Sequence, residues 1–232
     1  MASKPFQEFA GSSVGKKVVM ALSGLFLVLF VIIHMLGNLS FLAGPETFNA
    51  YSHKLISLGP LLYVIEIILL LAFLFHAYYG IVVSAGNRRA RPQKYAGLKS
   101  AGDPSKKSIS SVTMIYTGII LLIFLIIHLK TFKFGPNVED GYVMELHGEK
   151  IRDLHRLVLE KFSHPEYAFG YIAVMLLLGF HLRHGFWSAF QSLGANHPRY
   201  SPLIYTVGVI LAVLLAVGFI AVPLLTYFKI VG

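Results

Sequence analysis

"LLYVIEIILLLAFLFHAYYGIVV", residues 61–83, is apolar throughout except for Glu66 and His76. A helix of about 20 apolar residues crosses the ~30 Å hydrocarbon layer of a bilayer. The chain of 232 residues is 56% hydrophobic and 13% charged, whereas about a quarter of the residues of a soluble domain are charged. Apolar runs of this length occur at 17–38, 60–85, 112–132, 167–190 and 203–227. The sequence therefore predicts an all-α integral membrane protein, a single domain over residues 1–232 built as a bundle of five transmembrane helices.

Basic residues predict how the bundle lies in the membrane. The first run follows Lys16 and Lys17, and the loop at 87–108 carries seven Lys or Arg residues against one acid. Because short loops rich in Lys and Arg stay in the cytoplasm, we expect the N-terminus and this loop on the inner face of the cytoplasmic membrane. Such a loop favours contact with lipid or with a partner subunit, and no nucleic acid is expected as a partner.

The longest outer segment, residues 131–168, is expected to hold a short amphipathic helix. Its apolar residues recur near the helical period, at Ile151, Leu154, Leu157, Val158 and Phe162. A helix of this kind lies on the membrane surface with its apolar face toward hydrocarbon.

Four histidines lie inside the runs, at positions 34, 76, 128 and 181, and each stands late in its own run. Adjacent spans cross the membrane in opposite directions, so a late position is outer in the first and third spans and inner in the second and fourth. At 1.5 Å per residue, His34 and His128 share an outer level, and His76 and His181 share an inner level about 15 Å away.

Small residues accompany these histidines in a repeated pattern. "SGLFLVLFVIIH", residues 23–34, aligns without gaps with "TGIILLIFLIIH", residues 117–128, and the second and fourth spans share F-H-x-x-x-G instead. The small residues of these motifs leave room for a flat, wide group beside the histidines. They are Ser23, Gly24, Thr117, Gly118, Gly80 and Gly185.

Haem is the group that best suits paired histidines in a membrane, because imidazole is a standard axial ligand of haem iron. We expect two b haems, one held by His34 and His128 and the other by His76 and His181. A single zinc site on all four histidines is excluded, because the two levels are too far apart for zinc–nitrogen bonds near 2 Å. Histidines that only pack or relay protons in a haem-free transporter are the other alternative.

The residues that surround these histidines carry a family resemblance. "VIIHMLGN", "FNAYSH", "YVIEIILL", "FHAYYGI", "LIIHLKTF" and "FHLRHGFWS" occur in this order and extend over nearly the whole chain. The chain resembles the five-helix diheme cytochrome b membrane-anchor subunit of succinate dehydrogenases and fumarate reductases, the succinate:quinone oxidoreductases of respiratory complex II. In that family the haem ligands pair between the first and third spans and between the second and fourth.

The resemblance implies a role in electron transport. A flavoprotein subunit and an iron–sulfur subunit would bind on the cytoplasmic face and hold the dicarboxylate site, and electrons would pass through the two haems to menaquinone or another quinone. The chain has no cysteine, in keeping with clusters that belong to a partner chain. Whether the whole complex forms an oligomer stays open. A diheme subunit of a nitrate reductase or a hydrogenase is the alternative assignment.

Less specific predictions concern quinone, protons and the haem propionates. Glu66 lies inside a span, where an unpaired carboxylate is costly, and we expect it to handle quinone or protons together with His53 and Asn49 of the first outer loop. The structural alternative is that Glu66 only hydrogen-bonds a neighbouring loop. Arg183 is a candidate donor to a propionate. Some relatives have a proton-carrying glutamate where this chain has Gly179.

Overall fold

The computed structural model describes residues 8, 9, 11–89, 109–195 and 197–231. Most of the basic loop that is predicted to face the cytoplasm, at 90–108, lies outside the described residues. The five long helices are α2 (Ser13–Leu39), α4 (Pro60–Arg89), α5 (Ile109–His128), α7 (Pro165–Ser192) and α8 (Ser201–Tyr227).

These helices confirm the predicted fold class. Each of the five is long and apolar enough to cross a membrane. Four of them, α2, α4, α7 and α8, cover a predicted span with a few residues added at one or both ends, and α5 begins three residues before the third span and ends at His128. Helix α5 continues as a π-helical turn, η2 (Leu129–Lys133), so that the third span also reaches its predicted end. The chain is thus an all-α, multi-pass membrane bundle.

Local sequence explains where the long helices begin. The side chain of Ser12 accepts a hydrogen bond from the Gly15 amide at 2.9 Å and caps α2. Helices α4 and α7 begin with a proline, and α8 has Pro202 next to its first residue. Proline is favoured there because the first amides of a helix have no carbonyl partner within it.

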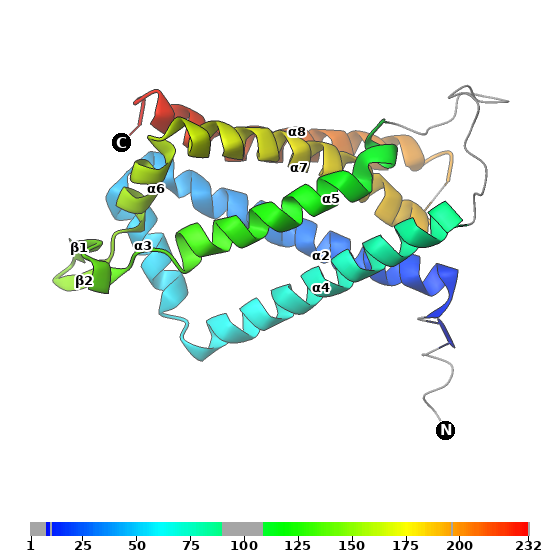
Figure 1. The fold of residues 1–232 in the computed structure, drawn as a ribbon, viewed down its shortest axis with the longest axis horizontal. Coiled ribbons are helices and arrows are strands. Elements are labelled where there is room, and N and C mark those ends of the chain that lie inside the picture. Colours follow the sequence, from blue (N-terminus) through cyan, green and yellow to red (C-terminus); the bar gives the residue numbers. More distant parts are fainter. Residues whose placement is uncertain (1–7, 10, 90–108, 196, 232) are drawn as a thin grey trace.

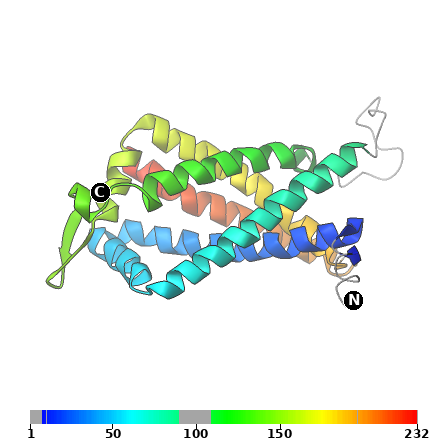
Figure 2. The same ribbon diagram turned by 60° about the horizontal axis from the view of Figure 1, so that its bottom comes forward.

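The helices run along one long axis, as Figures 1 and 2 show. Helix α2 packs along both α4 and α7, and α5 packs along α7 and, at fewer points, along α4. These four helices therefore form a square in which α2 faces α5 across one diagonal and α4 faces α7 across the other. Helix α8 packs outside the square against α7 and α2.

One end of the bundle carries a structure that we call the cap (Figure 1). It consists of η1 (Ser40–Ala43), α3 (Pro45–Ile56), η3 (Val138–Asp140), β1 (Val143–Leu146), β2 (Glu149–Arg152) and α6 (Leu154–Phe162). Aromatic and aliphatic side chains of the cap pack onto the ends of α7 and α8 in one buried cluster, which includes Phe41, Phe48, Phe162, Tyr171 and Val222.

The predicted amphipathic helix is present as α6, but it is shorter than its apolar pattern indicated. It begins at Leu154, because Asp153 accepts a hydrogen bond from the Arg156 amide at 3.0 Å and caps the helix. Ile151 instead belongs to β2, which pairs antiparallel with β1. The hairpin turns at His147 and Gly148, whose φ angles are 51° and 83°, as a tight two-residue turn requires.

Candidate functional site

The four intramembrane histidines come together as two pairs, each across one diagonal of the square. The ring centroids of His34 and His128 lie 5.8 Å apart, and those of His76 and His181 lie 6.3 Å apart. We call the first two the outer pair, on the side of the cap, and the second two the inner pair. These are the pairs that the sequence predicted. Their role as ligands stays a prediction.

The spacing within each pair suits one metal ion between two rings. With metal–nitrogen bonds of about 2 Å and a ring radius of about 1 Å, the centroids of two opposed imidazoles lie about 6 Å apart. The rings meet at 89° in the outer pair and at 72° in the inner pair. Each ring turns freely about its own metal–nitrogen axis, so two ligands of one iron can be nearly perpendicular.

Contacts across the bundle place the two pairs at different depths. A β-carbon at Gly24 on α2 would lie 3.0 Å from Cε1 of His76, and one at Gly118 on α5 would lie 3.7 Å from Cε1 of His181. Gly24 precedes His34 by ten residues, and Gly118 precedes His128 by ten residues. Ten residues of helix rise about 15 Å, which is the separation of the two levels that the sequence indicated.

Hydrogen bonds fix the rings of the inner pair. Nδ1 of His76 lies 3.2 Å from the carbonyl oxygen of Met20, and Nδ1 of His181 lies 3.0 Å from the hydroxyl of Thr117. Because both bonds use Nδ1, Nε2 is the ring nitrogen that can bind a metal in each histidine. Metal-binding histidines in proteins commonly bind the metal through one ring nitrogen and form a hydrogen bond through the other.

Aromatic side chains surround the outer pair. Phe30 stacks on His34 with centroids 5.3 Å apart, and Phe124 stacks on His128 with centroids 5.6 Å apart. Each phenylalanine stands four residues before its histidine, a repeat that the sequence analysis did not use. Tyr171 adds its hydroxyl 3.4 Å from Nδ1 of His128. The outer pair therefore lies among aromatic side chains.

The other small or basic candidates differ in what they contact. The hydroxyl of Ser23 bonds the carbonyls of Val19 and Met20 in its own helix. Side chains added at Gly80 would meet open space, and one at Gly185 would meet only Met114, 3.9 Å away. Arg183 donates to the Tyr205 hydroxyl and lies over its ring, and so is tied to α8.

Gly179 lies between helices α7 and α8. A β-carbon at this position would stand 3.2 Å from Cβ of Ala216 and 3.5 Å from the carbonyl oxygen of Ala212. A proton-carrying side chain at this position would have to displace α8, so the glycine serves close helix packing here.

The structure does not bring Glu66, His53 and Asn49 together. Within the described residues, no hydrogen bond or ion pair joins any two of them. Glu66 accepts a hydrogen bond from Lys133 in η2 and forms an ion pair with it, which is the kind of contact that the structural alternative expected. Nε2 of His53 lies 3.6 Å from a carboxylate oxygen of Glu149 on the hairpin.

Asn49 belongs to the cap. Its side chain is fully buried, and its amide nitrogen donates to a carboxylate oxygen of Asp153 at 2.8 Å. Its amide oxygen accepts from the backbone amide of His155 at 2.9 Å. Both ends of the amide thus join α3 to the start of α6, and the part of Asn49 in quinone binding stays a prediction.

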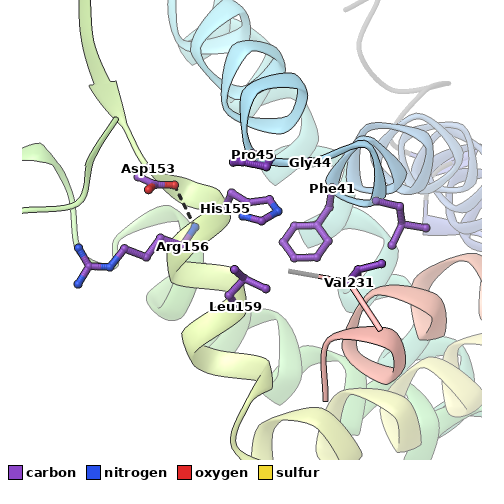
Figure 3. Close-up of a pocket in the computed structure, with 9 residues that line it drawn as sticks. Phe41, Gly44, Pro45, Asp153, His155, Arg156, Leu159 and Val231 are labelled. Atoms are coloured by element: carbon purple, nitrogen blue, oxygen red, sulfur yellow. Dashed lines mark hydrogen bonds between the residues drawn. The ribbon is translucent and has the colours of Figure 1, made fainter. Parts of the chain in front are cut away.

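His155 is a buried histidine of the cap, 5% exposed, that no sequence pattern singled out. Its ring stacks on Phe41 with centroids 4.3 Å apart and lines a pocket of about 420 Å³. Figure 3 shows this pocket between Phe41, His155, Leu159 and Val231, with the charged end of Arg156 turned away from it. Burial lowers the pKa of His155, against the opposing effects of the Asp153 charge and a hydrogen bond to the Phe41 backbone.

No cluster of three or more His, Cys, Asp or Glu side chains suited to a metal ion occurs in the described parts of the chain. Within these parts the four histidines therefore lie as two separate pairs. Comparisons of the chain with protein-family models, with curated proteins and with solved structures found no match.

Proposed function

We propose that this chain is a diheme cytochrome b, the membrane-anchor subunit of a succinate:quinone oxidoreductase. The single observation that carries the haem assignment is the presence of two histidine pairs across the two diagonals of one bundle, with centroids about 6 Å apart. The choice of a succinate-oxidising or fumarate-reducing complex rests on the resemblance of the motifs around these histidines.

Each pair has a definite task in this proposal. His34 and His128 would hold the outer haem, and His76 and His181 the inner one. Haem with two histidine ligands supplies one-electron transfer and leaves no coordination position for oxygen. The phenylalanines beside the outer pair exclude water, and the absence of a side chain at Gly24 lets His76 lie against α2.

The experiment is an optical redox titration of the complex purified from its own membranes. Two Soret-absorbing haems per chain, both reduced by added succinate, would support the whole proposal. Two haems that succinate leaves oxidised, in a preparation without a flavoprotein, would instead favour the nitrate reductase or hydrogenase alternative. A purified, folded chain without Soret and α bands would overturn both assignments.

Quinone and proton handling is proposed at the outer level, at Glu66. Ten residues separate Glu66 from His76, which places the carboxylate about 15 Å toward the cap and near the depth of the outer pair. Its partner Lys133 follows His128 by five residues. This ion pair would thus put a carboxylate near the depth of the outer haem. His53, which pairs with Glu149, also stays a candidate for quinone or proton handling.

The Glu66 assignment predicts that Glu66→Gln slows quinone-coupled turnover at least tenfold, while succinate still reduces both haems. Glu166→Gln, an exposed acid at the start of α7, is the matched control. Unchanged quinone turnover and quinone affinity in Glu66→Gln would leave Glu66 with the structural role that its ion pair already gives it.

A further inference from the structure

The two inner histidines have different hydrogen-bond partners, and only one of these partners is a side chain. His76 is held by a backbone carbonyl, whereas His181 is held by the hydroxyl of Thr117. Given the proposed function, we propose that Thr117 is a positioning residue of the inner haem site. It fixes the tautomer of His181 and raises the electron density on Nε2, and it does not bind a propionate.

Proton counting gives the direction of the hydrogen bond between Thr117 and His181. A threonine hydroxyl has one proton, and the carbonyl oxygen of Met114, 3.0 Å away, can only accept, whereas Nδ1 of His181 can donate. Both contacts are hydrogen bonds only when Thr117 gives its proton to Met114, and we assign the proton there. The hydroxyl oxygen can therefore only accept from the ring of His181. It follows that Nδ1 of His181 carries the proton and that the lone pair is on Nε2.

The same reasoning applies to His76. The carbonyl oxygen of Met20 accepts hydrogen bonds and cannot donate them, so Nδ1 of His76 is also the protonated nitrogen. Both inner rings are therefore set, before any ligand binds, in the tautomer that offers Nε2 to a metal. Thr117 is 6% exposed, so water does not compete for its bond with His181.

Ser23 occupies the position of Thr117 in the aligned segment 23–34, but among the described residues its hydroxyl does not bond to a histidine. Ser23 and Thr117 are equivalent in the two aligned segments, yet the Ser23 hydroxyl bonds only carbonyls of its own helix at 2.7 and 3.2 Å. Of the two hydroxyls, the structure thus gives only that of Thr117 a bond to a predicted ligand. Ser23 is consequently a matched control at the same depth.

Removal of the Thr117 hydroxyl has a defined effect on the inner haem. An imidazole that donates through Nδ1 is a more basic ligand through Nε2, and a more basic ligand favours ferric over ferrous iron. Thr117→Val keeps the shape of the side chain and removes the acceptor. We expect the preference for the ferric state to fall about tenfold, which raises the midpoint potential of the inner haem by about 59 mV.

The test is an optical redox titration of the purified complex that carries Thr117→Val, Thr117→Ser or Ser23→Ala. A His76→Ala complex, which retains only the outer haem, identifies the spectrum of each haem. The proposal expects a raised inner potential in Thr117→Val, and wild-type potentials in Thr117→Ser and Ser23→Ala. Loss of the inner haem in Thr117→Val with its retention in Thr117→Ser would also support the hydroxyl's role.

Three results would overturn the role of Thr117. They are an unchanged inner potential in Thr117→Val, equal shifts of both haems, and loss of the inner haem in Thr117→Ser as well as in Thr117→Val. An absence of haem from the wild-type complex is a different outcome, because it removes the proposed function itself.

Discussion

Replacement of Asn49 by alanine should loosen the cap, because this side chain joins α3 to the start of α6. The substitution removes a hydrogen bond to the Asp153 carboxylate and leaves the buried amide of His155 without its acceptor. A hydrogen bond to a charged group contributes about 1.5–3 kcal/mol, and an unsatisfied buried group costs about 1–3 kcal/mol. We therefore expect the free energy of opening of the cap to fall by about 3 kcal/mol, roughly a hundredfold in the opening equilibrium.

Amide hydrogen exchange of the purified protein measures this opening directly. The His155 amide should exchange roughly a hundredfold faster in Asn49→Ala than in the wild type, since its acceptor is lost and the start of α6 frays. Asn87→Ala, an exposed position on α4, should leave the rate unchanged. Wild-type exchange at His155 in the Asn49→Ala protein would refute the assignment of Asn49 to the cap.

Two further predictions concern a glycine and a buried histidine. Gly24→Ala should lower retention of the inner haem, because the new β-carbon would stand 3.0 Å from the ring of His76. Gly86→Ala, a position on α4 where a new β-carbon meets nothing within 4 Å, should retain both haems, and equal haem contents in the two variants would contradict this. Burial lowers the pKa of His155 from 6.5 in the closed cap, so the open cap binds a proton that the closed cap does not. The equilibrium between closed and open cap should therefore shift toward the open cap as the pH falls below about 6.5. The protection factor of the amide of residue 155 measures this shift, and His155→Gln should abolish it.

The long elements of the fold were predictable because hydrocarbon imposes a strong constraint. A span must be a helix of about 20 apolar residues, so five runs gave five helices with ends close to those observed. The pairing of the histidines followed from the same regularity. The alternating direction of the spans and a fixed rise per residue assign His34 and His128 to one depth and His76 and His181 to another.

The cap was less predictable because its elements are short. Strands β1 and β2 have four residues each, too few to display an alternating pattern, and Ile151 therefore looked like part of α6. The use of Asn49 depends on Asp153 and His155, about a hundred residues later in the chain, and no local pattern indicates such a contact. The hydrogen bond between Thr117 and His181 depends likewise on how α5 packs against α7.

Haem content in double histidine variants tests the central claim most directly, because it measures which histidines act together. Each single replacement by alanine should leave one haem per chain, as measured by the pyridine haemochrome spectrum of the purified protein. His34→Ala combined with His128→Ala should still retain one haem, whereas His34→Ala combined with His76→Ala should retain none. Loss of both haems in the first double variant, or retention of one in the second, would contradict the pairing across the two diagonals.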